Sequence, residues 1–241
     1  VRNDRTRVFQ EDFQYAHDRV LLGPKREEVL NHRERKKTAV HEAGHALVSK
    51  KVPGSDPLHK VTIIPRGMAL GLTHALPVED RYNRDKAFLL GEIAILMGGR
   101  AAEAVILDQL SQGAANDIER ATQQARKMVC EWGMSESIGP LTFGRKEEQI
   151  FLGRDFAQHR EYSPETANAI DQEIKRIVTD NYDRARKILE EKKTALLQIA
   201  EELLTREVLT GAQILRIVSG LPLEEPVEAA PVASGQPEPT S

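Results

Sequence analysis

Apolar side chains recur at helical spacing along most of this chain of 241 residues. The spacing predicts helices over residues 31–52, 83–107 and 113–132, which capping residues, glycine or proline delimit. A longer apolar stripe over residues 165–210, uninterrupted by Gly or Pro, predicts one long helix or a bent pair. A last short helix is expected to begin at Thr210. The pattern therefore indicates a mainly helical protein.

Two short stretches between the first two helices have the composition of strands. Residues 60–65 are rich in β-branched side chains, and residues 69–76 include Gly71, Leu72 and Thr73. A glycine-containing strand between prolines is typical of a sheet edge. Such an edge can bind an extended peptide through main-chain hydrogen bonds, although an ordinary two-stranded ribbon explains the pattern equally well. The predicted fold class is thus mainly α (α+β), with a small β-sheet that carries an edge strand and with long C-terminal helices.

The two ends of the chain differ from its middle. Residues 1–24 contain one plausible helix, too short to fold alone, and are interpreted as the tail of an upstream domain with a linker. Residues 25–220 contain the predicted domain. Residues 221–241 include five prolines, cannot pack, and are expected to be disordered. Because the chain begins at Val1 and not at a methionine, we expect a fragment or a processed product.

Composition narrows the class of protein. A hydrophobic content of 40% and a charged content of 29% are ordinary for a soluble, helix-rich protein. The 34 basic and 37 acidic residues are spread along the chain, which argues against nucleic-acid binding. The single cysteine, Cys130, excludes an internal disulfide and a cysteine-rich zinc site, and it is expected in the core together with Trp132. Charged residues interrupt the most apolar stretch, 87–107, so no transmembrane span is predicted.

The first predicted helix contains the motif His41-Glu42-x-x-His45. Four residues make just over one helical turn, so His41 and His45 project from one face and can bind one divalent metal. Glu42 is rotated by about 100° and lies beside the metal, where a carboxylate could take a proton from water. Two exposed histidines on an amphipathic helix are the alternative. Gly44 lowers the stability of the helix by about 1 kcal/mol relative to Ala. A glycine here either lets a substrate or another backbone come close, or packs against a neighbouring helix.

A catalytic zinc site needs a third protein ligand, and two carboxylates compete for this role. Glu103 lies in an apolar setting, where it could bind the metal, orient a histidine or pair with Arg100. Asp117 lies in the first turn of its helix, which the helix dipole alone would explain. The remaining histidines are not spaced as a metal set (His17, His32, His59, His74 and His159). Spacing therefore leaves the choice between Glu103 and Asp117 open.

Several other motifs follow the histidine motif in order. They are Val-Thr-Ile-Ile-Pro-Arg-Gly at 61–67, Gly-Gly-Arg-Ala-Ala-Glu at 98–103, Gly-Ala-Ala-Asn-Asp at 113–117 and Met-Val-Cys-Glu-Trp-Gly at 128–133. Together, over roughly residues 8–218, they resemble the peptidase domain of the FtsH family of membrane-anchored, ATP-dependent (AAA+) zinc metalloproteases.

This resemblance implies a zinc metalloendopeptidase with one Zn²⁺ per chain. In that family the two motif histidines and the aspartate of the Gly-x-x-Asn-Asp segment bind zinc. The implied ligands are His41, His45 and Asp117, with Glu42 as the catalytic base. Glu103 matches the family's acidic position after the Gly-Gly-Arg step and is interpreted as a residue that supports the ligands. The substrate peptide would lie along residues 71–73.

The resemblance also implies partners. It suggests degradation of unfolded, membrane and short-lived regulatory proteins by a homo-hexamer with an upstream AAA+ ATPase domain, whose helical lid would end within residues 1–24. ATP would bind only to that domain, because its motifs are absent from this chain. We expect a soluble fragment of a protein of the bacterial inner membrane, with this domain in the cytoplasm. A catalytically silent helical module that assembles the hexamer is the alternative, which the intact motif residues disfavour.

Overall fold

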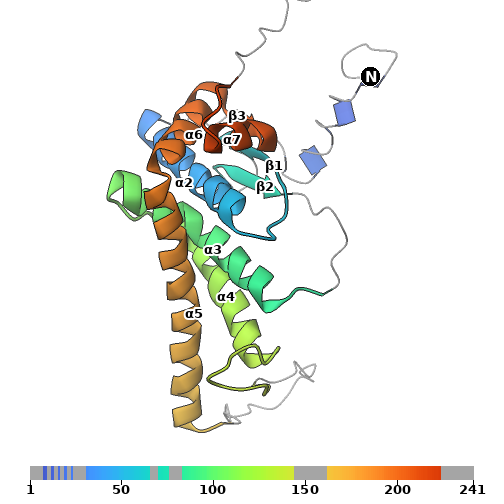
Figure 1. Cartoon of the computed structure of the whole chain (residues 1–241), viewed down its shortest axis with the longest axis vertical. Helices are drawn as coiled ribbons and strands as arrows, with labels where there is room; N and C mark the ends of the chain where they lie inside the picture. Colours follow the sequence, from blue (N-terminus) through green and yellow to red (C-terminus); the bar gives the residue numbers. More distant parts are fainter. Residues whose placement is uncertain are drawn as a thin grey trace, which may run out of the picture.

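The computed structural model describes residues 31–65, 70–75, 83–143 and 162–223, with isolated positions between residues 8 and 23. Helices make up most of it: α2 (His32–Lys51), α3 (Lys86–Ala102), α4 (Ala115–Cys130), α5 (Pro164–Glu191), α6 (Lys193–Arg206) and α7 (Gly211–Val218) (Figure 1). Three short strands, β1 (Leu58–Thr62), β2 (Leu72–Ala75) and β3 (Val208–Thr210), form one sheet. The predicted mainly α (α+β) class is confirmed.

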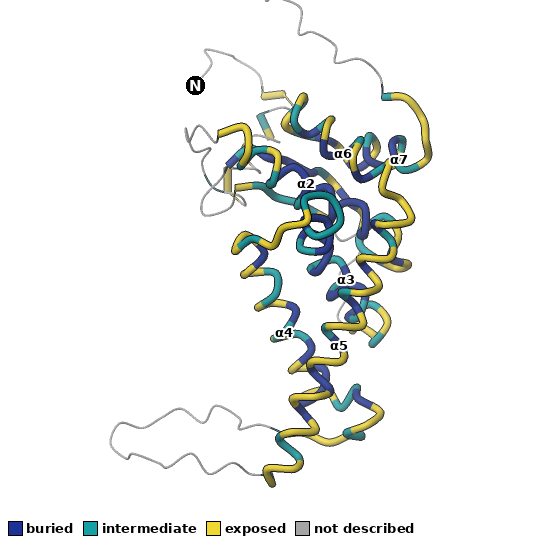
Figure 2. Tube along the Cα trace, turned by 90° about the vertical axis from the view of Figure 1, so that its left-hand side faces the viewer, coloured by how far each residue is buried: buried dark blue, intermediate teal, exposed yellow. Residues whose placement is uncertain are grey.

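Helix α2 lies at the centre of the folded body and packs against α3, α6 and β1 (Figure 2). It begins where the Asn31 side chain accepts a hydrogen bond from the Glu34 backbone N–H at 2.9 Å. From Thr38 to Ser49 every residue except His41 is buried. The helix is therefore enclosed on nearly all sides and not on one apolar stripe alone, as expected for a core helix.

Small residues let α2 and α3 cross closely. A Cβ added to Gly44 would lie 2.4 Å from the carbonyl oxygen of Gly98, and one added to Gly98 would lie 2.9 Å from the carbonyl oxygen of Gly44. Two of the uses considered for Gly44 therefore coincide, since the helix that packs against it, α3, brings its own backbone close. The crossing holds both motif histidines against α3.

The sheet has the strand order β2-β1-β3, and both pairs are antiparallel. Within the described residues β2 is paired on one side only, so the predicted edge strand is present. Strand β3 was missed, because the apolar stripe predicted a helix up to residue 210. Helix α6 ends at Arg206, Glu207 adopts a left-handed conformation with φ 61°, and Leu209 then pairs with Val61. The bent pair of helices is confirmed by the break between α5 and α6 at Lys192.

The segment between α3 and α4 changes helical type twice. Helix α3 continues as a π-helix, η1 (Glu103–Leu107), and the chain turns at Asp108, whose φ of 50° is left-handed. A 3-10 turn, η2 (Gln112–Ala114), then leads into α4. Helix α4 therefore begins beside the end of α3 at which the chain left that helix.

The core prediction for the end of α4 was half right. Cys130 is buried, but Trp132, which follows the end of α4, is 45% exposed. The helix predicted within residues 1–24 lies largely outside the described residues, as do residues 224–241 of the tail. Among the described residues, no helix has the length and apolar character needed to cross a bilayer.

Candidate metal centre

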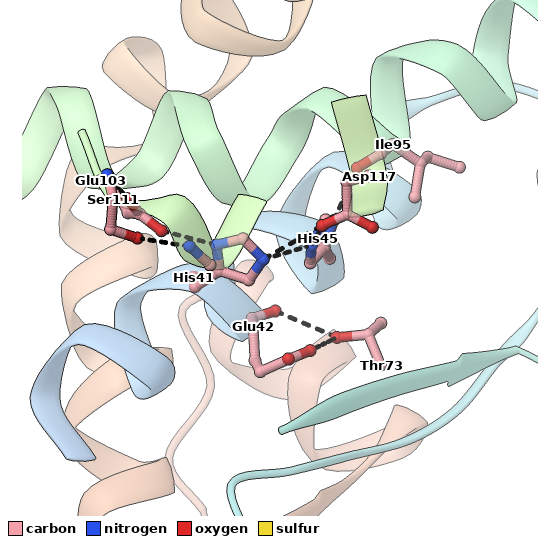
Figure 3. A network of polar contacts seen from close by, with 9 residues as sticks. His41, Glu42, His45, Thr73, Ile95, Glu103, Ser111 and Asp117 are labelled. Carbon is pink, nitrogen blue, oxygen red and sulfur yellow. Dashed lines mark hydrogen bonds and ion pairs between the residues drawn. The ribbon is translucent and has the colours of Figure 1, made fainter. Parts of the chain in front are cut away.

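Three side chains from α2 and α4 converge on one point. The Nε2 atoms of His41 and His45 lie 3.0 Å apart, and Asp117 Oδ2 lies 3.2 Å from each of them (Figure 3). The exposed-histidine alternative is thereby contradicted, since His45 is buried and the His41 side chain is only 13% exposed. The α2 geometry supplies two donors on one face, and the first turn of α4 supplies the third.

The spacing of these donors fits a zinc ion. Zinc–ligand bonds of about 2.0–2.1 Å in tetrahedral geometry place neighbouring donor atoms about 3.3 Å apart. The observed separations of 3.0–3.2 Å are close to that value. Two imidazoles and one carboxylate are also a typical donor set for catalytic zinc, with one position left for water.

The other nitrogen of each imidazole is held by an acceptor. His45 Nδ1 lies 2.7 Å from the backbone oxygen of Ile95, and His41 Nδ1 lies 2.8 Å from Glu103 Oε1. A carbonyl or carboxylate oxygen can only accept, so both Nδ1 atoms donate and both Nε2 atoms face the shared point. Two Nε2 atoms at 3.0 Å repel unless a proton or a cation lies between them. The arrangement therefore favours a bound cation.

Glu103 lies at the first residue of the π-helix, and its side chain is almost fully buried. Its second oxygen accepts a hydrogen bond from the Ser111 backbone N–H at 3.0 Å. Burial alone would raise the pKa of Glu103, but the hydrogen bonds from His41 and Ser111 outweigh it and lower the pKa. The carboxylate thus contacts the far side of the His41 ring, not the point that the three donors share.

Charge compensation holds the centre together. Burial would lower the pKa of His41, but its hydrogen bonds to Asp117 and Glu103 raise that pKa to about 10. Burial would likewise raise the pKa of Asp117, and the hydrogen bonds of His41 and His45 hold it well below its ordinary value. A divalent cation bound by these three residues would take the place of the proton that His41 otherwise holds, so metal binding would release a proton.

Glu42 lies beside these donors, in contact with the edge strand. Thr73 Oγ1 donates a hydrogen bond of 2.7 Å to Glu42 Oε2, and Glu42 is only 7% exposed. Burial is the main cause that raises the pKa of Glu42. A Cβ at Gly71 would lie 2.7 Å from the Glu42 carboxylate, so a glycine is needed for this close approach. Leu72 pairs with Thr62 of β1.

Several supporting residues escaped the sequence reasoning. A Cβ at Gly99 would lie 2.4–2.6 Å from the His41 ring, so this glycine makes room for the imidazole. The double glycine at 98–99 was a usable signal for it, since glycine in an apolar helix usually marks close packing. The backbone groups of Ile95 and Ser111 carry no sequence signal, because any residue type supplies them.

Comparison with known proteins agrees with this geometry. Residues 28–217 match the model of peptidase family M41. The chain is 50% identical, over 98% of its length, to the ATP-dependent zinc metalloprotease FtsH of Magnetococcus marinus, and 48% identical over 91% to that of Myxococcus xanthus. It is 46% identical over 91% of its length to the protein of the same name from Thermotoga maritima. The chain spans 36%, 35% and 36% of these relatives, about a third of their length.

Proposed function

Because the chain belongs to peptidase family M41, we propose that residues 25–220 form a zinc metalloendopeptidase that cleaves polypeptides. The observation that carries this proposal is the convergence of His41, His45 and Asp117 on one point, with the buried carboxylate of Glu42 beside it. The relatives named above are zinc metalloproteases by name, which agrees with this donor set. A catalytically silent assembly module would have no need for a complete set of these four residues.

The proposed mechanism assigns a role to each contact. His41, His45 and Asp117 would hold Zn²⁺, which, when bound, polarises a water molecule and the scissile carbonyl. Glu42 takes a proton from the attacking water and passes it to the leaving amine as the C–N bond breaks. Burial makes the Glu42 carboxylate more basic, which favours the first of these transfers. Glu103 keeps the His41 ring in its orientation.

We propose that the substrate lies extended along residues 71–73. Within the described sheet β2 pairs with β1 on one side, so its other edge can form main-chain hydrogen bonds with a peptide. Thr73 and Gly71 bring this edge against Glu42. A peptide added there would present its backbone to the base and the metal centre.

The rest of the protein is proposed from the relatives, since the chain covers about a third of their length. The full-length protein would carry an AAA+ ATPase domain before this one, with its lid ending within residues 1–24, and a membrane anchor. It would form a homo-hexamer in the bacterial inner membrane, with the peptidase domain in the cytoplasm, and would use ATP to unfold membrane and short-lived regulatory proteins. Zinc chemistry and ATP hydrolysis would thus lie in separate domains.

The test compares wild type with Glu42→Gln, using Glu201→Gln on the exposed face of α6 as a matched control. Wild type and the control should bind one zinc per chain and hydrolyse casein, and a chelator should stop both. Glu42→Gln should keep its zinc but lose hydrolysis by about 10²–10⁴-fold, the usual contribution of a general base. Turnover near wild type in this variant removes Glu42 as the base. Absence of both zinc and hydrolysis in wild type favours the assembly module.

A further inference from the structure

A surface cavity of about 750 Å³ lies between α3 and α4. Its apolar lining comes from Leu89, Leu96, Met134 and the ring of Trp132. Trp132 is 45% exposed, although an indole gains more from burial than most side chains. An exposed aromatic residue in a concave surface is a common feature of ligand sites.

The cavity begins next to the metal centre. On α3, Leu96 follows Ile95, whose carbonyl holds His45. On α4, Arg120 follows Asp117 by three residues, so the two are neighbours on one face of the helix. Figure 3 shows Ile95 and Asp117 close to each other at the site. One end of the cavity therefore lies within about one helical turn of Asp117 on α4 and of Ile95, which contacts His45, on α3.

From this end the cavity runs away from the site along two antiparallel helices. Gln124 of α4 donates a hydrogen bond of 2.8 Å to the backbone oxygen of Leu89, six residues before Ile95, so residue numbers rise on one helix as they fall on the other. Figure 1 shows α3 and α4 side by side in this direction. From Asp117 to Lys127 the distance is about 15 Å, which is the length of four or five extended residues.

The charge of the cavity is positive. Arg84, Arg120 and Lys127 line it, and no described lining residue is acidic. Arg84 binds Glu92 at 3.3 Å. In the described part of the chain the side chains of Arg120 and Lys127 form no hydrogen bond or ion pair, and both residues are exposed on α4. An incoming carboxylate would therefore meet two cations that are not held in ion pairs.

We propose that this cavity is a subsite that binds the substrate polypeptide next to the scissile bond and selects a large apolar residue with acidic neighbours. The apolar side chain is buried against Leu96, Met134 and Trp132, and the carboxylates pair with Arg120 and Lys127. The inference rests on the proposed peptidase function, since it takes the neighbouring metal centre as the place of cleavage. Main-chain contacts at the β2 edge accept many substrate sequences, whereas the cavity would add a contact that depends on the substrate's side chains.

Trp132 is the only tryptophan of the chain, so its fluorescence reports occupancy of the cavity without any need for hydrolysis. The zinc-loaded Glu42→Gln protein is titrated with a peptide of about ten extended residues that has Phe flanked by Glu, and with the same peptide carrying Lys instead. The Glu peptide should shift the emission and saturate, with an affinity at least about tenfold higher than that of the Lys peptide. Adding Arg120→Glu and Lys127→Glu together should reverse this preference. Adding Arg126→Glu, an exposed residue of α4 outside the cavity lining, should leave it unchanged.

Either of two binding results overturns the proposal. Equal affinity for the two peptides shows that the cations select nothing. An emission shift that follows protein concentration and not peptide concentration shows that copies of the chain cover the cavity. Failure of the peptidase function is separate, because wild-type protein that leaves casein intact can still bind the Glu peptide. Conversely, an active wild type that cleaves both peptides equally well retains the function and loses the subsite.

Discussion

Replacing Glu103 with alanine should weaken zinc binding without abolishing it. The carboxylate is 2% exposed and makes two hydrogen bonds, one of 2.8 Å with His41 Nδ1 and one of 3.0 Å with the Ser111 N–H. The first bond orients a proposed zinc ligand. The second orders the turn that leads back to Asp117. The substitution therefore acts on the metal through its surroundings and leaves all three donor atoms in place.

The size of the effect follows from these two bonds. Loss of a group that orients a ligating histidine lowers metal affinity by about 10–100-fold, which corresponds to about 1.4–2.7 kcal/mol. The half-buried Ser111 N–H also loses its acceptor, which costs about 0.5–1.5 kcal/mol of unfolding free energy even without zinc. Glu103→Gln should lie between wild type and alanine, because an amide has one acceptor oxygen where the carboxylate has two. Asp117→Ala removes a donor and should lower the affinity by more than roughly 100-fold.

Competition with a chromogenic chelator measures the zinc affinity of the four proteins, and urea unfolding of the zinc-free forms measures their stability. The expected order of affinity is wild type, Glu103→Gln, Glu103→Ala and Asp117→Ala. Circular dichroism confirms that each variant is folded. If Glu103→Ala loses more affinity than Asp117→Ala, the third ligand is Glu103. If Glu103→Ala binds zinc as well as wild type, the contact with His41 contributes nothing to the site.

Three further changes test other contacts. Thr73→Val removes a hydrogen bond that lowers the pKa of Glu42, so the pKa of Glu42 should rise in this variant. The acid limb of the pH profile of kcat/KM should then move to higher pH, and an unchanged limb would contradict this role of Thr73. Gly44→Ala places a Cβ 2.4 Å from a backbone oxygen of α3 and should reduce the unfolding free energy, measured by urea denaturation, by about 1–3 kcal/mol. A variant more stable than wild type would contradict the close crossing of α2 and α3. The hydrogen bonds of Arg176 and, to a smaller extent, of Ser135 lower the pKa of Glu173 to about 2. The resulting stabilisation is present above the unfolded pKa near 4.3 and is lost as the pH falls through 2. Glu173→Gln should therefore be less stable than wild type by about 1–2 kcal/mol at pH 6, and most of this difference should be gone near pH 2; a difference that keeps its full size there would have another cause.

The fold was predictable where local signals and tertiary contacts agree. Asn31 and Ser163 cap their helices through local contacts, because a capping side chain bonds to a backbone N–H only three residues away. The residues just before Thr210 show the opposite case. Val208 and Leu209 continue the apolar stripe of the helix, but the chain leaves the helix at Glu207 and Leu209 pairs with Val61. Strand pairing depends on a distant partner, which local periodicity does not reveal.

The sequence by itself determined the part of the site that lies within one helical turn. His41 and His45 share a face, with Glu42 beside them, because helix geometry relates residues four apart wherever the helix occurs. Only the tertiary structure decided which distant carboxylate meets them. The π-helix and the following turns place Glu103 behind His41 and bring Asp117 to the shared point, across separations of 62 and 76 residues in the chain. Such separations are set by the packing of α3 and α4 against α2, and no spacing along the chain encodes that packing.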